Sequence, residues 1–118
     1  MGITNIHAKI SSIEKPGKSA EGDFMVDTGA GYTVLPYDIV KSLGLKPTKK
    51  QKFSLADGTT IERKLSWAMI EIDGSKAPST VVLGQKGDSA LLGVITLENM
   101  GLMVDPFKRK LLPMRLML

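Results

Sequence analysis

The sequence predicts an all-β domain, built as a small closed β-barrel with two short helices. Short apolar or alternating runs recur along the chain, and glycine, proline and aspartate turns separate them, which is the pattern of many short strands. Only two segments, residues 37–43 and 95–100, have the spacing and the end signals of a helix. A chain of 118 residues has room for one modest core, so residues 1–118 are predicted to form a single domain.

The composition excludes several classes of function. The chain has no cysteine, so neither a disulfide framework nor a thiolate metal site is available. His7 is its only histidine, and we predict no metal and no cofactor. The net charge of +4 comes from basic residues spread over loops with few aromatic residues between them, which argues against a nucleic-acid partner. No run approaches membrane-spanning length and the N-terminus has no signal-peptide core, so we expect a cytoplasmic protein with no membrane contact.

The first third of the chain predicts two strands joined by a loop. Residues 3–13 alternate between apolar and polar side chains, which indicates a half-exposed strand with His7 on the solvent side. Residues 14–22 contain two glycines and a proline among charges, as hairpin loops do. Residues 24–26 are all apolar and predict a strand buried on both faces. Asp27 is therefore expected where the chain leaves the core.

The helix predicted at residues 37–43 has clear boundaries. Pro36 suits its first turn, and Gly44 suits a C-terminal cap because glycine readily adopts a left-handed conformation. Residues 45–51 are rich in lysine and predict a basic connection.

Two hairpins follow. Residues 53–55 and 60–65 predict strands on either side of a turn at residues 56–59, because Asp57-Gly58 between alternating segments is a strong hairpin signal. A second hairpin is expected at residues 73–74, with a strand at 65–72 before it. After Pro78, residues 80–84 predict another buried strand.

The last part of the chain predicts a helix, a strand and a tail. Residues 90–93 are a short apolar run that ends in glycine, and the helix at 95–100 follows it and ends at Gly101. Residues 102–104 predict a final core strand. Residues 107–118 are read as a basic and apolar tail.

One motif indicates a function. Asp27 is followed by Thr28 and Gly29, and such a tripeptide is by itself an ordinary turn sequence. Its setting is more specific, because residues 24–30 read FMVDTGA and residues 33–36 read TVLP. Together these segments closely resemble the active-site motif of retropepsin-like aspartic proteases, the family of the retroviral proteases.

The resemblance extends from about residue 3 to residue 106 and implies roles for individual residues. It implies that Asp27 is catalytic and that the active-site loop is supported by Thr28, Gly29 and Ala30. The first hairpin resembles the flap that closes over a substrate, with flap residues Leu55, Ala56, Asp57, Gly58 and Thr59. The family's second signature, which packs beneath the catalytic loop, is matched by Leu91, Leu92 and Gly93. The flap turn and the helix at 37–43 resemble prokaryotic cellular members more than retroviral ones.

Some positions depart from the retroviral pattern. Gly31 stands where retroviral members usually carry an acidic residue that binds the substrate backbone. Val94 stands where they carry an arginine paired with that acid. Both partners are absent together, so substrate anchoring and dimer contacts are expected to differ. The tail at residues 107–118 also extends beyond the usual retroviral end.

The resemblance implies a homodimer, since the chemistry needs two carboxylates around a water and the chain supplies one Asp-Thr-Gly. Asp27 of each subunit would meet its symmetry mate and hydrolyse peptide bonds in an extended polypeptide substrate. The apolar terminal segments, residues 3–10 and 102–118, are the expected interface. A different class stays open: a catalytically silent dimeric module of the same fold that binds or scaffolds a peptide without cutting it.

The binding cavity beside the active-site loop is expected to be largely apolar and to accept large hydrophobic side chains. The residues expected to contribute are Ala30, Val82, Leu83 and Leu92, with Leu55, Ala56 and Ile61 from the first hairpin.

Overall fold

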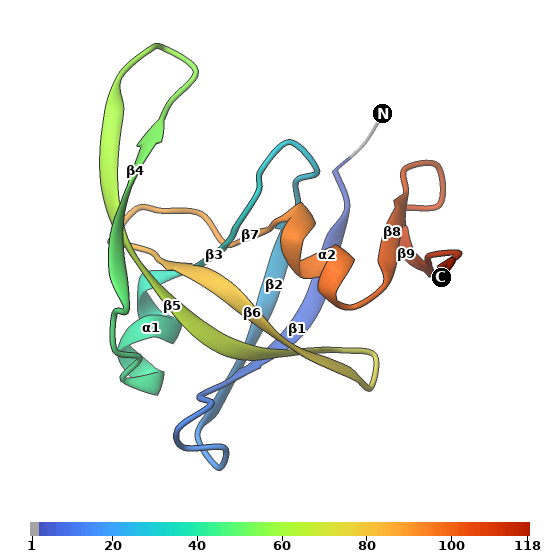
Figure 1. Ribbon diagram of the computed structural model, residues 1–118, viewed down its shortest axis with the longest axis horizontal. Helices are drawn as coiled ribbons and strands as arrows, with labels where there is room; N and C mark the ends of the chain where they lie inside the picture. Colours follow the sequence, from blue (N-terminus) through green and yellow to red (C-terminus); the bar gives the residue numbers. More distant parts are fainter. Residues whose placement is uncertain (1–2) are drawn as a thin grey trace.

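The computed structural model describes residues 3–118, which form nine strands and two short helices (Figure 1). Their bounds in chain order are β1 Asn5–Ser11, β2 Ser19–Val26, β3 Thr33–Leu35, α1 Tyr37–Leu43, β4 Lys49–Ser54, β5 Thr60–Ile72, β6 Ser75–Leu83, β7 Leu91–Leu92, α2 Val94–Asn99, β8 Leu102–Asp105 and β9 Lys110–Pro113. The predominance of strands confirms the predicted all-β class. Within residues 3–118, no helix is long and apolar enough to cross a membrane.

Seven of the strands form one sheet in the order β1-β2-β7-β3-β6-β5-β4. β1 pairs with β5 as well as with β2. The six strands from β1 to β5 in this order therefore form a ring, and β4 lies outside it. Neighbouring strands are mostly antiparallel, but β2–β7 and β3–β6 are parallel. The short strands β3 and β7 pair directly with each other, although many residues separate them in the sequence.

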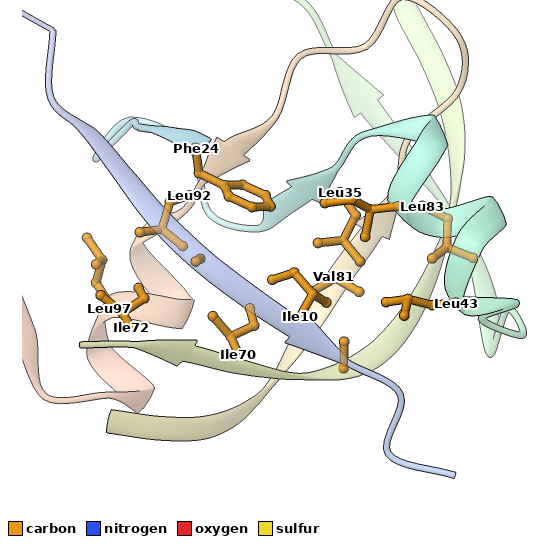
Figure 2. Packing of buried hydrophobic residues seen from close by; sticks show 13 residues of the cluster. Ile10, Phe24, Leu35, Leu43, Ile70, Ile72, Val81, Leu83, Leu92 and Leu97 are labelled. Atoms are coloured by element: carbon orange, nitrogen blue, oxygen red, sulfur yellow. The ribbon is translucent and has the colours of Figure 1, made fainter. Parts of the chain in front are cut away.

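The ring of strands encloses the hydrophobic core (Figure 2). Strand residues alternate between faces, so every second side chain of β1 and β5 points inward. Phe24 and Leu92 lie together at one end of the core, while Leu43 of α1 lies at the other. Burying a large apolar side chain contributes about 1.5–3 kcal/mol. The core therefore holds β2 and β7, the two strands that lead into the predicted active-site loop and second signature.

Several local predictions are confirmed. β1 is half-exposed and His7 faces solvent. α1 spans residues 37–43 as predicted, and Gly44 caps it with a left-handed φ of 61°. Both Asp-Gly hairpins are present, and α2 begins one residue earlier than expected, at Val94.

Two further predictions need correction, one about burial and one about the length of a connection. Of residues 24–26 only Phe24 is fully buried, because Met25 and Val26 border a surface hollow beside the termini. The predicted basic connection at 45–51 is shorter, since β4 already begins at Lys49. Cross-strand pairing with β5 extends β4 in this direction.

The strand at 80–84 is also longer than predicted, because β6 begins at Ser75 and contains Pro78. The Pro78 carbonyl accepts a hydrogen bond from the Asn99 side chain, so this edge of Pro78 faces α2. In a strand the N and the C=O of one residue point to the same edge, so the missing N–H of Pro78 removes no bond to β5.

The C-terminal prediction needs the largest correction. The strand predicted at residues 102–104 is present as part of β8, but it pairs with β9 in a separate two-stranded sheet. Leu102 is only partly buried where it packs against the core. Met103 is exposed. The tail predicted at residues 107–118 contains a strand, because Lys110–Pro113 forms β9. Arg109, with a φ of 53°, lies in the turn before this strand.

Candidate active site

Asp27 follows β2 directly and begins a tight turn. Its carboxylate oxygen Oδ1 accepts a hydrogen bond from the Gly29 N–H at 3.0 Å, and its carbonyl accepts one from the Ala30 N–H at 3.1 Å. The Asp27 side chain is half-buried, whereas Thr28 and Gly29 are exposed. The turn thus orients one carboxylate oxygen and leaves the motif accessible.

The predicted second signature lies against this turn. The Asp27 N–H donates to the Leu92 carbonyl at 3.0 Å, where β7 pairs with the end of β2. At the start of α2, the N–H groups of Val94 and Ile95 donate to the carbonyls of Ala30 and Gly31 at 2.9 and 3.0 Å. The first N–H groups of a helix have no partner within the helix. Here the active-site loop supplies those partners, so α2 and the loop stabilise each other.

Gly93 allows this close contact. A Cβ at Gly93 would come within 2.5 Å of the Tyr32 carbonyl and 2.7 Å of the Gly31 oxygen. No side chain fits there without moving the active-site loop.

Sequence reasoning missed a buried row of hydroxyl groups under the loop. Thr33 Oγ1 lies 2.6 Å from Thr96 Oγ1, which lies 2.8 Å from Ser79 Oγ. The Gly93 N–H donates to Thr33 Oγ1 at 3.0 Å. These contacts join β3, β6 and α2. Hydroxyl residues within apolar runs were the available signal, because buried polar groups need partners.

A cavity of about 400 Å³ lies beside the active-site loop, between it and the β4–β5 hairpin. Its walls are mainly apolar, as expected, with Ala30, Val82, Leu55 and Ile61 among the lining residues. Leu83 and Leu92 do not line it, because their side chains point into the core. Leu91, the alternate residue of β7, lines it instead.

The tip of the β4–β5 hairpin is exposed. Gly58 has a φ of 86°, and the Asp57 carboxylate accepts hydrogen bonds from the N–H and the hydroxyl of Thr59 at 2.9 and 2.6 Å. The bond from the Thr59 hydroxyl is the main cause that lowers the pKa of Asp57. Only Leu55 of the predicted flap residues borders the cavity, while residues 56–59 extend beyond it.

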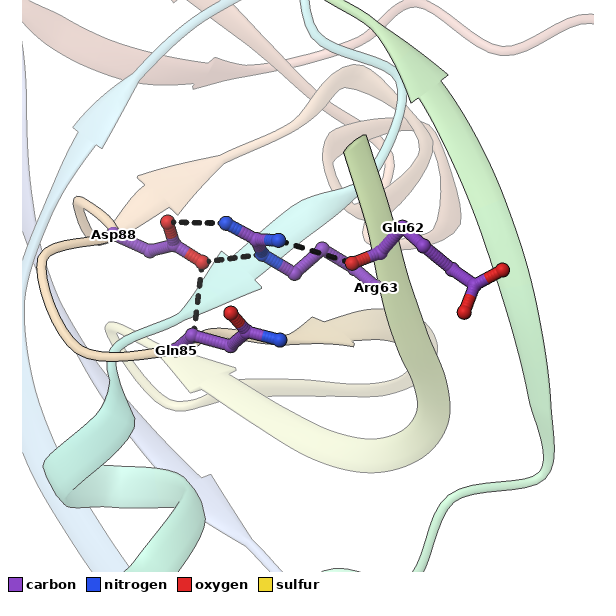
Figure 3. Close-up of polar contacts among 4 residues, drawn as sticks. All are labelled: Glu62, Arg63, Gln85 and Asp88. Atoms are coloured by element: carbon purple, nitrogen blue, oxygen red, sulfur yellow. Dashed lines mark hydrogen bonds and ion pairs between the residues drawn. The ribbon is translucent and has the colours of Figure 1, made fainter. Parts of the chain in front are cut away.

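An ion pair that the sequence did not predict ties the hairpin to the rest of the molecule (Figure 3). Arg63 Nε and Nη2 donate to the two carboxylate oxygens of Asp88 at 2.7 and 3.0 Å. These bonds lower the pKa of Asp88 and raise that of Arg63. Both residues line the cavity. No local pattern signals this pair, because its members lie on different elements.

Asp27 itself borders a second hollow, of about 360 Å³, on the other side of the loop. Ile3 and Thr4 from the N-terminal segment and Val104 and Pro106 from β8 and its turn line it. In Figure 1 the β4–β5 hairpin and the β8–β9 hairpin lie at opposite ends, with the active-site loop between them. The Asp27 carboxylate therefore lies between the 400 Å³ cavity and the terminal segments.

Residues 3–118 hold no group of three or more histidine, aspartate or glutamate side chains placed to bind a metal ion. A search of curated proteins finds no match. A family model described as "gag-polyprotein putative aspartyl protease" matches residues 17–99, well over half of the chain. The matched segment contains the Asp27 turn, the β4–β5 hairpin and the Gly93 contact.

Proposed function

The chain belongs to this retropepsin-like aspartic protease family, and from that membership we propose that it is an aspartic endopeptidase that acts as a homodimer. The observation that carries the proposal is the placement of Asp27. Its carboxylate is oriented by the Gly29 N–H, and it lies between a largely apolar cavity and the terminal segments.

The dimer completes the site, because each chain has a single Asp-Thr-Gly. In an isologous dimer each Asp27 faces its symmetry mate across the two-fold axis. Two carboxylates held this close do not both ionise easily, so the pair retains one shared proton. By resemblance, the Thr28 hydroxyl groups hold the two loops together across the axis.

The reaction then follows general acid–base chemistry. The ionised Asp27 accepts a proton from a water molecule, which attacks the scissile carbonyl carbon. The protonated Asp27 of the other subunit donates its proton to the carbonyl oxygen as the tetrahedral intermediate forms. When the intermediate collapses, this oxygen returns the proton, the C–N bond breaks, and the leaving amine takes the proton that the first Asp27 accepted. The substrate binds as an extended strand, and the hairpin tip at residues 56–59 closes over it.

The exposed apolar residues of the terminal segments support the dimer. Ile3 is 63% exposed and Phe107 is 89% exposed, and the large apolar residues at the C-terminal end, Leu116 to Leu118, are also exposed. Contiguous exposed apolar surface is typical of an interface, and these residues all belong to the segments that are expected to form one. The expected interface at residues 3–10 is reduced, because Ala8 and Ile10 are buried in the chain's own core.

The decisive experiment replaces Asp27 with Asn and measures cleavage of a generic peptide library across pH. Asn keeps the shape of the side chain but cannot ionise, so turnover should be abolished while the fold survives. The matched control is Asp73→Asn, an exposed turn residue with a positive φ that Asn tolerates well. Unchanged cleavage by the Asp27→Asn protein would refute an aspartic protease.

Two further readouts separate the protease from a silent binding module. A transition-state-mimicking inhibitor of aspartic proteases should block cleavage. Activity should also be highest on the acid side of neutral, since the shared proton is lost at higher pH. If the parent protein and the Asp27→Asn variant bind peptides equally well and neither cleaves them at any pH, the chain is the binding module instead.

A further inference from the structure

The Arg63–Asp88 ion pair occupies one wall of the binding cavity. We propose that it determines substrate specificity: each charge cancels the other, so the cavity selects uncharged substrate side chains and rejects charged ones. The inference rests on the proposed function in one respect, namely that the bound molecule is a polypeptide.

The geometry of the pair is well defined. Besides its two bonds to Asp88, Arg63 donates from Nη1 to the Glu62 carbonyl at 2.9 Å. Asp88 Oδ2 also accepts the Gln85 N–H at 2.8 Å, and the Asp88 N–H donates to the Gln85 carbonyl at 2.9 Å. Both charged groups are thus held by the backbone as well as by each other (Figure 3). Charge-assisted, two-point contacts of this kind are strong and directional.

The position of the pair links it to substrate binding. β5 pairs with β6 only from Lys64 onward, so Arg63 is at the base of the projecting hairpin. The side chains of Arg63 and Asp88 are 16% and 24% exposed, and both border the same cavity as Ala30 of the active-site loop. A peptide side chain that enters this cavity from the active-site loop therefore meets the pair.

Charge compensation explains the selectivity. The other walls are largely apolar, with Val34, Val82 and Leu91 among them. A charged substrate side chain would lose its hydration there, and it would find no free opposite charge because Arg63 and Asp88 already pair with each other. Burial of a charge without a partner costs free energy. Removal of one member of the pair leaves the other charge free. Asp88→Asn should therefore admit acidic side chains next to Arg63, and Arg63→Gln should admit basic ones next to Asp88.

A purely structural role of the ion pair, in which it only fixes the position of the hairpin, predicts a different result. If the pair acted through the position of the hairpin alone, both variants would weaken binding of all peptides by similar factors. Opposite changes in charge preference arise only if a substrate side chain lies close to the pair. The two explanations therefore differ in the direction of the effect.

The test measures peptide binding to protein that carries Asp27→Asn, so that no peptide is cut. Fluorescence anisotropy gives the Kd for a positional series of peptides that differ in one side chain, with leucine, glutamate or lysine at the varied position. With Arg63 and Asp88 intact, leucine should be preferred. At one position of the peptide, Asp88→Asn should raise the affinity for the glutamate peptide relative to the leucine peptide by about fivefold or more. Arg63→Gln should raise the relative affinity for the lysine peptide by a similar factor.

Matched controls exist on the same hairpin. Glu62 and Lys50 form an exposed ion pair with a 4.0 Å separation, and the Glu62 carboxylate points away from Asp88 in Figure 3. Glu62→Gln and Lys50→Gln change the net charge by the same amounts as the test variants but lie outside the cavity. They should leave the preference unchanged. The proposal would be overturned if the control variants changed the charge preference as much as the test variants do. It would also be overturned if both test variants lost affinity for all peptides by similar factors.

The double variant Arg63→Gln with Asp88→Asn covers the case in which a single variant does not fold. This double variant has no unpaired charge, so it should again prefer the leucine peptide. Tight binding of both the glutamate and the lysine peptide to the double variant would contradict the proposal. Cleavage by protein with intact Asp27 is scored separately. Charge-selective binding without any cleavage would support this inference and refute the protease, whereas leucine peptides that bind to no variant would overturn the inference itself.

Discussion

The hydroxyl oxygens of Thr33 and Thr96 lie 2.6 Å apart, and both side chains are fully buried. Thr33 begins β3 directly after the active-site loop, and Thr96 lies in α2. This contact, extended to Ser79 on one side and to the Gly93 N–H on the other, joins the two signature segments beneath Asp27.

Thr96→Val should destabilise the protein. Valine has nearly the same shape, but it removes the hydroxyl that serves both Thr33 and Ser79. Leaving buried polar groups short of a partner costs about 1–3 kcal/mol. Urea unfolding should show a loss of this size, and the control Thr60→Val, at an exposed position of β5, should change the free energy of unfolding little. Equal stability of the two variants would contradict the role of the buried hydroxyl row.

Gly93→Ala should disrupt the active-site loop. The added Cβ would overlap the backbone of Tyr32 and Gly31, which cannot move without breaking the loop contacts to α2. Overpacking typically costs about 1–3 kcal/mol, and a clash with backbone lies at the upper end. The control is Gly17→Ala, where an added Cβ meets nothing within 4 Å. Thermal unfolding of both variants measures the difference, and a Gly93→Ala protein as stable as the control would contradict the close packing.

The pKa of His7 should be raised above the ordinary histidine value. Its two ring nitrogens lie 3.0 Å from carboxylate oxygens of Asp23 and Glu21, and the hydrogen bond to Asp23 is the main cause that raises its pKa. A raised pKa means that the stabilisation is complete below about pH 6.5 and is lost as the pH rises through the folded-state value. NMR titration of this single histidine gives the value directly. Asp23→Asn should lower it more than Glu21→Gln does, and the reverse order would contradict the assignment.

The Arg63–Asp88 pair should make stability sensitive to acid. Its hydrogen bonds lower the pKa of Asp88, so the carboxylate stabilises the fold above its ordinary pKa of about 3.9, and this contribution is lost as the pH falls through the lower, folded-state value. Asp88→Asn should therefore cost about 1–2 kcal/mol at pH 7, and the difference from the parent should shrink toward pH 2. Urea unfolding at the two pH values tests this. A difference that is the same at both values would be inconsistent with it.

The proposed homodimer predicts that activity depends on protein concentration. If the proposed homodimer is right, a lone subunit has only half of the active site, so dilution below the dimer dissociation constant should lower the activity per chain. An excess of Asp27→Asn subunits should also suppress the activity of intact ones by forming mixed dimers. Sedimentation at the same concentrations gives the state of association. Full activity in a monomer would rule out the shared site.

Local signals in the sequence were sufficient for much of the fold. Pro36 and Gly44 mark the ends of α1, and the Asp57-Gly58 and Asp73-Gly74 pairs mark both hairpins. The Asp27 motif identified the family without any knowledge of the structure, as the family match confirms. Each of these signals is contained in a few adjacent residues, whose own conformational preferences decide the local structure.

The contacts that build the site depended on the tertiary structure. Thr33 and Thr96 meet because β3 and α2 pack together, and Arg63 reaches Asp88 because β5 leaves the ring beside the loop before β7. The β8–β9 pairing likewise places the strand predicted at residues 102–104 in a separate sheet and makes part of the predicted tail a strand. Such contacts join residues far apart in the chain. Their partners are set by strand register and by the packing of whole elements, and neither quantity is contained in any short stretch of sequence.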